Sequence, residues 1–157
     1  MKLAELVRED SILLDFEAAD RWQAIERMVD HLVGRGRIEP GMRKAVLDAL
    51  VAREKIATTG MEHGVAIPHA QVDGLEDAVA AFAISPKGVP FECADGAPAT
   101  LIALLIIPRR SIRTHIRTLA GIARLLNYEE MRSALLKSRT AHQASETLQR
   151  EEEKGLG

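Results

Sequence analysis

Residues 101–107 form a continuous apolar run. A strand with one face in water alternates apolar and polar residues, so an unbroken run is typical of a central strand covered on both faces. The run is far too short to span a membrane. Residues 78–84 form a second candidate strand shortly before it. Two strands this close in sequence favour a mixed sheet over a purely parallel one.

Helical patterns lie on both sides of these strands. A first helix is predicted after Asp20, whose side chain can cap it, and it should stop at Gly34. A second helix should begin at Pro40 and end near Arg53. Further helices are predicted over residues 111–126 and after two possible capping boxes, Asn127 with Glu130 and Thr140 with Gln143.

The order of these elements predicts the fold class. Helices, then strands, then helices are expected to form an α/β (α+β) fold, a single domain with a central mixed β-sheet flanked by helices. A length of 157 residues fits one domain. We expect the core of this domain to span about residues 3–150 and the charged residues 151–157 to form a solvated tail.

Composition narrows the functional classes. Aromatic residues make up only 3% of the chain, so stacking platforms for single-stranded nucleic acid are not expected. A net charge of -2 provides no general attraction to nucleic acid or to an anionic membrane. The single cysteine, Cys93, excludes an intramolecular disulfide, which suits a reducing compartment. We therefore expect a cytoplasmic protein with no nucleic-acid partner and no direct membrane insertion.

Pro68 and His69 follow a short apolar segment, residues 65–67. We expect this segment to be a strand that stops at the proline, whose fixed φ stiffens the chain just before the ring. A neutral imidazole can act as a nucleophile near pH 7. The sequence contains no nucleotide-binding loop, so a phosphoryl group carried on His69 would have to arrive on another protein. The alternative is a surface histidine that merely follows a strand.

Arg53 is a second candidate site residue. On a helical projection it lies between Ala49 and Leu50, inside the apolar stripe of its helix. A cation in that position should either extend its charge to solvent or meet an anion, and a phosphoryl group matches the guanidinium fork. The alternative is an arginine at a helix C-terminus that bonds to local carbonyl groups.

His115 is a third candidate. It shares the apolar face of the helix over residues 111–126 and lies near its first turn, where free N–H groups favour an anion. The alternative is a half-buried core histidine with a backbone partner. Four nearby cations could steer a phosphorylated or acidic partner, or simply form a solvated helix face: Arg109, Arg110, Arg113 and Arg117.

Other kinds of site have weaker support. A metal site made by His63 and His69 would need a turn, because the two rings lie about 20 Å apart if residues 63–69 are extended. The sequence has no zinc-finger spacing and no Gly-x-Ser-x-Gly elbow. Cys93 has no evident activating partner. We therefore expect no metal and no cofactor.

Several short motifs occur in one order over about residues 3–150. They are Arg53-Glu54, Thr58-Thr59-Gly60, Gly64-Val65-Ala66-Ile67-Pro68-His69, Asp95-Gly96-Ala97-Pro98 and His115-Ile116-Arg117-Thr118-Leu119-Ala120. With these motifs the chain resembles the IIA domains of the bacterial phosphoenolpyruvate-dependent phosphotransferase system, of the fructose–mannitol type. That class includes stand-alone nitrogen-regulatory IIA proteins.

The resemblance implies a role for each candidate residue. By motif position, His69 would carry the phosphoryl group, His115 would contact it and Arg53 would stabilise it. The donor would be the phosphohistidine of HPr, a small carrier protein, or of its nitrogen-branch equivalent. The family fold is a mixed sheet flanked by helices. Ala70 departs from the family pattern, because it stands where glycine is usual.

The functional hypotheses differ in what the protein does after His69 has accepted a phosphoryl group. A nitrogen-regulatory IIA protein would bind a regulatory target, such as a kinase or a potassium transporter, according to its phosphorylation state. A sugar-transport IIA protein would pass the phosphoryl group to a cysteine on a IIB domain. We prefer the regulator, because no fused IIB or membrane region is seen. A third possibility is a non-catalytic binding module, which the intact set of Arg53, His69 and His115 argues against.

Overall fold

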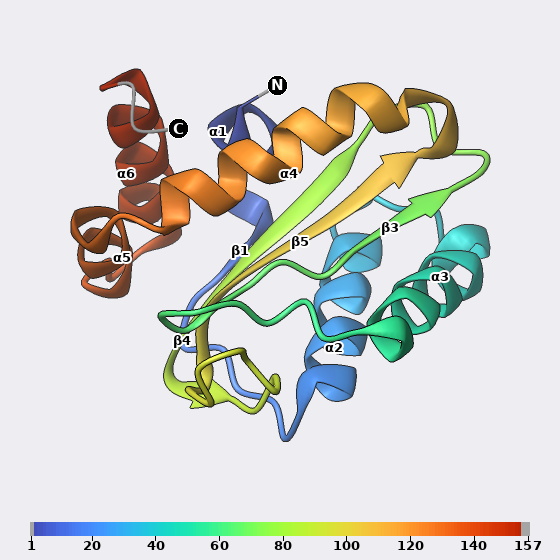
Figure 1. The fold of residues 1–157 in the computed structure, drawn as a ribbon. Helices are drawn as coiled ribbons and strands as arrows, with labels where there is room; N and C mark the ends of the chain where they lie inside the picture. Colours follow the sequence, from blue (N-terminus) through green and yellow to red (C-terminus); the bar gives the residue numbers. More distant parts are fainter. Residues whose placement is uncertain (1, 155–157) are drawn as a thin grey trace.

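In a computed structural model, which describes residues 2–154, helices cover both faces of a five-stranded mixed sheet (Figure 1). The strands are β1 (Ile12–Leu13), β2 (Val65–Ala66), β3 (His69–Val72), β4 (Val79–Val89) and β5 (Ala99–Pro108). Strand β5 pairs antiparallel with β4 and parallel with both β2 and β3, while β1 pairs parallel with β4. The predicted mixed sheet is therefore confirmed.

Strand β5 is the centre of the sheet, as its apolar run predicts. Alternate residues of β5 point into two separate cores. Ile102 and Leu104 belong to one core, and Leu101 and Leu105 belong to the other. All four side chains are almost completely buried. Because both faces of β5 are covered, the run needs no polar alternation.

Two helices cover one face of the sheet and four cover the other (Figure 1). On the first face lie α2 (Arg21–Gly34) and α3 (Arg43–Ile56). On the second face lie α1 (Leu3–Leu6), α4 (Ile112–Leu126), α5 (Glu129–Leu136) and α6 (Ala141–Glu153). This arrangement places α3 and α4 on opposite sides of the sheet that contains His69.

Local signals locate two helix starts correctly. Asp20 accepts a hydrogen bond from the N–H of Gln23 at 2.9 Å, and Thr140 accepts one from the N–H of Gln143 at 3.1 Å. The predicted box at Asn127 is wrong, because α5 begins after Tyr128 without a side-chain cap.

The sequence prediction also misplaced two boundaries near His69. Helix α3 continues past Arg53 to Ile56. His69 does not follow the last strand residue but begins β3, in register with Leu105 of β5. The reason is that Pro68 lacks only an N–H: its carbonyl still accepts a hydrogen bond from Leu105 at 2.9 Å, so pairing with β5 resumes after the proline.

The predicted solvated tail is wrong where the structure describes it. Residues 151–153 belong to α6, and the Glu152 side chain is buried. Its carboxylate accepts hydrogen bonds from the N–H groups of Leu3 at 2.9 Å and Ala4 at 2.6 Å. The free N–H groups at the start of a helix attract a carboxylate, so the end of α6 packs on the start of α1. Residues 155–157 lie outside the described residues.

Candidate functional site

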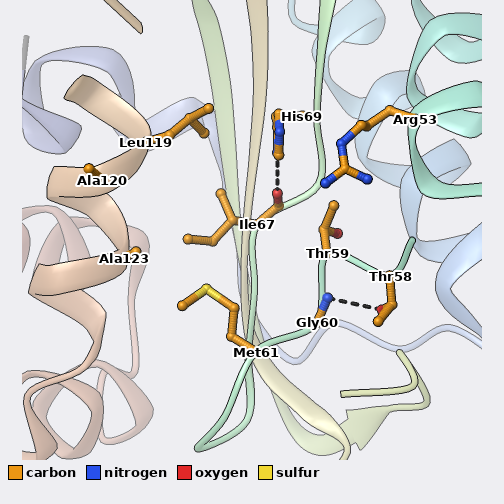
Figure 2. Close-up of a pocket in the computed structure, with 10 residues that line it drawn as sticks. All are labelled: Arg53, Thr58, Thr59, Gly60, Met61, Ile67, His69, Leu119, Ala120 and Ala123. Atoms are coloured by element: carbon orange, nitrogen blue, oxygen red, sulfur yellow. Dashed lines mark hydrogen bonds between the residues drawn. The ribbon is translucent and has the colours of Figure 1, made fainter. Parts of the chain in front are cut away.

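His69 lies at a cavity of about 340 Å³ between α3 and α4 (Figure 2). Three parts of the chain form its walls: the end of α3 with the segment 58–61, the segment that carries His69, and the middle of α4. The lining residues are Arg53, Thr58, Thr59, Gly60, Met61, Ile67, His69, Leu119, Ala120 and Ala123. One wall is therefore polar and the opposite wall is apolar.

The ring of His69 is held by a local hydrogen bond. Its Nδ1 lies 2.8 Å from the carbonyl oxygen of Ile67, and this bond is drawn in Figure 2. A carbonyl oxygen can only accept, so Nδ1 must carry the proton. Nε2 is then the nitrogen with the free lone pair, so Nε2 is the atom of this ring that could act as a nucleophile.

The surroundings of His69 favour its neutral form. Burial lowers the pKa of the ring below its ordinary value, and the nearby charge of Arg53 lowers this pKa further. The bond to Ile67 and the charge of Glu54 act in the opposite direction and raise it. Because the net shift is downward, the neutral form of the ring, with an available lone pair, is favoured at pH 7.

Arg53 extends from α3 toward His69 across the polar side of the cavity (Figure 2). Its Nη1 donates to the carbonyl oxygen of Ala57 at 2.9 Å. The interpretation as an arginine that bonds to local carbonyl groups is therefore confirmed, and the anion-binding interpretation stays a prediction, because one guanidinium has five N–H donors. The bond to Ala57 fixes the group, and the remaining donors can meet an anion.

The buried carboxylate of Glu54 holds the polar wall. The residue is only 1% exposed. It accepts hydrogen bonds from Thr59 through the backbone N–H at 2.8 Å and through the hydroxyl at 2.6 Å. Arg21 at the start of α2 pairs with the same carboxylate at 3.2 Å. A buried charge with this many partners is satisfied, so it ties the cavity wall to two helices.

Thr58 and Gly60 complete the polar wall. The Thr58 hydroxyl accepts from the N–H of Gly60 at 3.0 Å and donates to the carbonyl of Phe91. A Cβ on Gly60 would meet the Sγ of Cys93 at 2.8 Å and the carbonyl oxygen of Phe91 at 3.0 Å. Only glycine fits this position, so the Thr-Thr-Gly motif packs closely against the loop after β4.

Helix α4 supplies the apolar wall through Leu119, Ala120 and Ala123. His115, one turn earlier, does not line this cavity. His115 is 5% exposed, and burial lowers the pKa of its ring below the ordinary value. Its Nδ1 has no hydrogen-bond partner among the described residues. The structure thus brings Arg53 and His69 into one cavity, while His115 is buried beside it without the predicted backbone partner.

The four arginines around His115 divide into two pairs. Arg109 pairs with Asp73 at 3.1 Å, and Arg110 donates to the carbonyl of Glu76 at 2.7 Å. Arg113 and Arg117 are exposed.

The remaining sequence candidates lie outside this cavity. His63 is exposed at a positive φ of 63°, and its N–H donates to Asp95 at 3.0 Å. Within residues 2–154, no group of three or more metal-ligating side chains comes together. Cys93 is buried, and burial raises the pKa of its thiol. A buried thiol with a raised pKa is unreactive, in line with the lack of an evident activating partner in the sequence.

Sequence reasoning missed the role of Glu54. It follows Val46 and Leu50 at intervals of four residues, and this spacing predicts a buried position. The apolar stripe of α3 therefore leads to Glu54, whereas Arg53 lies at its edge. The signal that could have identified Glu54 as a buried, bonded carboxylate was its position at the end of this apolar stripe.

A family profile described as "Phosphoenolpyruvate-dependent sugar phosphotransferase system, EIIA 2" matches residues 5–151. The chain belongs to this family. The resemblance seen in the sequence motifs is thereby confirmed, and the family transfers phosphoryl groups.

Two relatives of this phosphotransferase IIA protein carry different names. The "PTS system fructose-specific EIIA component" of Haloferax volcanii is 35% identical over 137 residues, which cover 87% of this chain and 88% of the relative. A "Nitrogen regulatory protein" of Bradyrhizobium diazoefficiens is 33% identical over 144 residues, with 90% of each chain covered. The family thus includes both sugar-specific and nitrogen-regulatory relatives of this chain.

Solved structures agree with the fold. The nitrogen regulatory protein IIA-Ntr from Neisseria meningitidis has a TM-score of 0.84 at 28% identity, covering 93% of this chain and 98% of that one. The mannitol IIA of Escherichia coli, solved in complex with phosphorylated IIB, has a TM-score of 0.76 at 22% identity and covers 92% and 99%. The second likeness concerns the fold alone. The predicted α/β fold with a central mixed sheet is confirmed.

Proposed function

We propose that this protein is a stoichiometric phosphohistidine carrier that accepts its phosphoryl group on Nε2 of His69. The observation that carries the proposal is the ring itself: it is fixed through Nδ1, burial lowers its pKa, and it lies at a cavity that also contains Arg53. The proposed donor is the phosphohistidine of HPr or of its nitrogen-branch equivalent.

In the proposed step, the lone pair of Nε2 attacks the phosphorus atom of the donor phosphohistidine. A new N–P bond forms as the donor N–P bond breaks, and the electron pair of the broken bond returns to the donor ring. The His69 ring becomes cationic, and its Nδ1–H remains bonded to the carbonyl of Ile67. Arg53 neutralises charge on the transferred oxygens. Catalysis by this chain then consists of positioning and electrostatics.

His115 is a proposed contact of the bound phosphoryl group. Its motif matches that of the family's helix histidine, and its buried Nδ1 lacks a partner among residues 2–154. A buried polar atom without a partner is costly, so a phosphoryl oxygen that reached it would gain a favourable bond. This contact requires the first turn of α4 or the ring to move toward the cavity.

The physiological role that we propose is nitrogen regulation. The structural likeness to IIA-Ntr supports it. In this role the phosphoryl charge alters binding to a regulatory target, such as a kinase or a potassium transporter. The fructose-specific relative supports the second candidate, sugar transport, in which the phosphoryl group passes to a IIB cysteine. Transfer of label from the phosphorylated protein to a purified IIB domain would favour transport; its absence, with an active IIB, would favour regulation.

Two further proposals concern the chain as a whole. We propose that it folds as one domain, because helices from both ends of the described chain pack on the same sheet. We also propose a cytoplasmic location. Within residues 2–154, no helix combines the length and apolarity that crossing a membrane requires.

The test is phosphorylation by phosphoenolpyruvate, enzyme I and HPr, followed by intact mass on the wild type, His69→Ala and His63→Ala. We expect one acid-labile phosphoryl group on the wild type and on His63→Ala, and none on His69→Ala. His63 is the matched control, because it is an exposed histidine outside the cavity. Equal labelling of His69→Ala would refute the site, and no labelling of the wild type by active donors would refute the carrier role.

A further inference from the structure

Arg21 is the first residue of α2, and local criteria make this an unfavourable place for a cation. The free N–H groups at the start of a helix carry partial positive charge, so the position favours an acidic residue. The guanidinium is nevertheless held in place. It lies over the ring of Trp22, 4.5 Å from the ring centre, and the Arg21 side chain is only 15% exposed. A cation held there against the helix dipole indicates partners elsewhere in the fold.

The two partners of Arg21 lie on different segments. Its Nη1 lies 3.2 Å from a carboxylate oxygen of Glu54 near the end of α3, and its Nη2 lies 3.4 Å from one of Glu92 in the loop after β4. The Glu54 side chain is 1% exposed, whereas that of Glu92 is 78% exposed. Because water and salt screen the exposed pair, the buried pair with Glu54 is the stronger constraint.

Both segments that Arg21 joins also hold the polar wall of the cavity. Glu54 accepts hydrogen bonds from the N–H and the hydroxyl of Thr59. In the loop after β4, the carbonyl of Phe91 accepts from the hydroxyl of Thr58. Thr58 and Thr59 line the cavity, but Arg21 does not. Any effect of Arg21 on the reaction must therefore pass through these groups.

The charge of Glu54 also reaches His69. It raises the pKa of that ring, whereas burial and the charge of Arg53 lower the same pKa. Both charged groups come from α3, and the α4 wall opposite is apolar. Among residues 2–154, Arg21 forms the one ion pair of Glu54. A buried carboxylate that lost this partner would be an uncompensated charge beside the reactive ring.

From these contacts we infer that Arg21 is a positioning residue for phosphoryl transfer, which compensates Glu54 and thereby holds the segment 58–60 in the arrangement that His69 requires. The inference rests on the proposed function and extends its machinery to a residue outside the cavity. A positioning role affects the transfer step itself, because small displacements of a preorganised site slow the reaction strongly. A purely structural role would stabilise the fold without changing the rate of the folded protein.

The test is single-turnover phosphoryl uptake from the cognate phosphorylated HPr, measured over a range of donor concentrations. The variants are Arg21→Met, Arg21→Lys and the double variant Arg21→Met with Glu54→Gln. In the double variant, the glutamine oxygen can still accept from Thr59 and no unpaired charge remains. The controls are Glu92→Gln, which breaks only the exposed pair, and Arg35→Met. Arg35 is an exposed arginine at the other end of α2, and its loss changes the net charge equally.

We expect Arg21→Met to lower the rate at saturating donor about 10- to 100-fold, with the half-saturating donor concentration changed by less than about threefold. Arg21→Lys should recover part of this rate, because an ammonium group can pair with Glu54 but lacks the planar fork. The double variant should be at least about fivefold faster than Arg21→Met, because replacing a whole buried pair costs less than breaking it. Both controls should stay within about twofold of the wild type.

Several outcomes would overturn the inference while leaving the carrier role intact. One is a wild-type rate at saturating donor in Arg21→Met, even with a lower free energy of unfolding. A double variant no faster than Arg21→Met is another, as is a loss in Glu92→Gln equal to that in Arg21→Met. If Arg21→Met does not fold, Arg21→Lys decides: a wild-type rate overturns the inference, and a lowered rate with unchanged half-saturation supports it. Failure of the wild type to take up phosphoryl groups from active donors would overturn both proposals.

Discussion

The two walls of the His69 cavity differ in how firmly they are held. The wall from α3 and residues 58–60 is polar, and the buried carboxylate of Glu54 bonds it to Thr59 and Arg21. The wall from α4 consists of small or flexible apolar side chains, and His115 behind it has no partner for Nδ1 among residues 2–154. One wall is fixed by hydrogen bonds to a buried charge, and the other is formed by apolar side chains. Substitutions on the first wall should therefore have larger effects than substitutions on the second.

The largest effect is expected at Arg53. Arg53→Ala removes the cation of the polar wall and should lower the rate of phosphoryl uptake about 10²–10³-fold, the usual loss for one preorganised donor to a developing charge. Arg53→Lys should recover only part of this rate, because an ammonium group cannot reproduce the planar fork. Single-turnover labelling checks both variants. A lysine variant with the full wild-type rate would mean that charge alone, without geometry, is required.

Glycine-to-alanine changes in the polar wall and in the helix that carries the apolar wall should have opposite effects on stability. Gly60→Ala places a Cβ against Cys93 and Phe91 and should destabilise the fold by about 1–3 kcal/mol. Gly121→Ala on α4 meets no atom within 4 Å and should stabilise the fold by about 0.5–1 kcal/mol, because alanine favours the helix. Urea unfolding measures both free energies. If both substitutions destabilised the protein equally, the difference in packing between these two positions would be disproved.

Glu54→Gln should shift the titration of His69. The charge of Glu54 raises the pKa of the ring against the larger effect of burial, so its removal should lower this pKa further. The pKa of His115, whose shift has other causes, should stay unchanged and provides an internal reference. NMR titration of the two rings measures this directly. Equal changes in the pKa of both rings would indicate a general loosening of the fold and not a local charge effect.

The same lowered pKa predicts the pH dependence of the wild type. Protonated His69 is not a nucleophile, so uptake should fall on the acid side with a midpoint below 6.5, the ordinary pKa. The unfolded chain binds a proton at His69 more readily than the folded chain does. Stability from this group is therefore fully present above pH 6.5 and is lost as pH falls from there through the folded pKa. A pH–rate profile with a midpoint above 6.5 would contradict the assignment.

The smallest effect is expected on the apolar wall. Leu119→Met keeps the volume and the apolar character of the side chain, so uptake should stay within about threefold of the wild type and stability should change by less than about 1.5 kcal/mol. The same kinetic assay and urea unfolding provide the comparison with Arg53→Lys. A loss of uptake rate as large as that of Arg53→Lys would show that phosphoryl transfer depends on the shape of the α4 wall as strongly as on the polar wall.

Much of the fold follows from local patterns in the sequence. The apolar run 101–107 identifies the central strand, because a strand buried on both faces cannot alternate with polar residues. Asp20 and Thr140 mark helix starts, since capping acts over three residues. His69 and Arg53 also belong to local motifs, and the structure places both at one cavity.

Only the tertiary structure decided how distant parts of the chain satisfy one another. Sequence could not reveal that Glu54 bonds to Arg21, which is 33 residues away, or that Glu152 caps the helix that begins at Leu3. It also could not separate His69, at the cavity, from His115, buried beside it. Periodicity and capping depend on neighbours within one or two turns. Buried charges and ring orientations depend on which distant groups fill the space around them, and that is settled only when the layers pack.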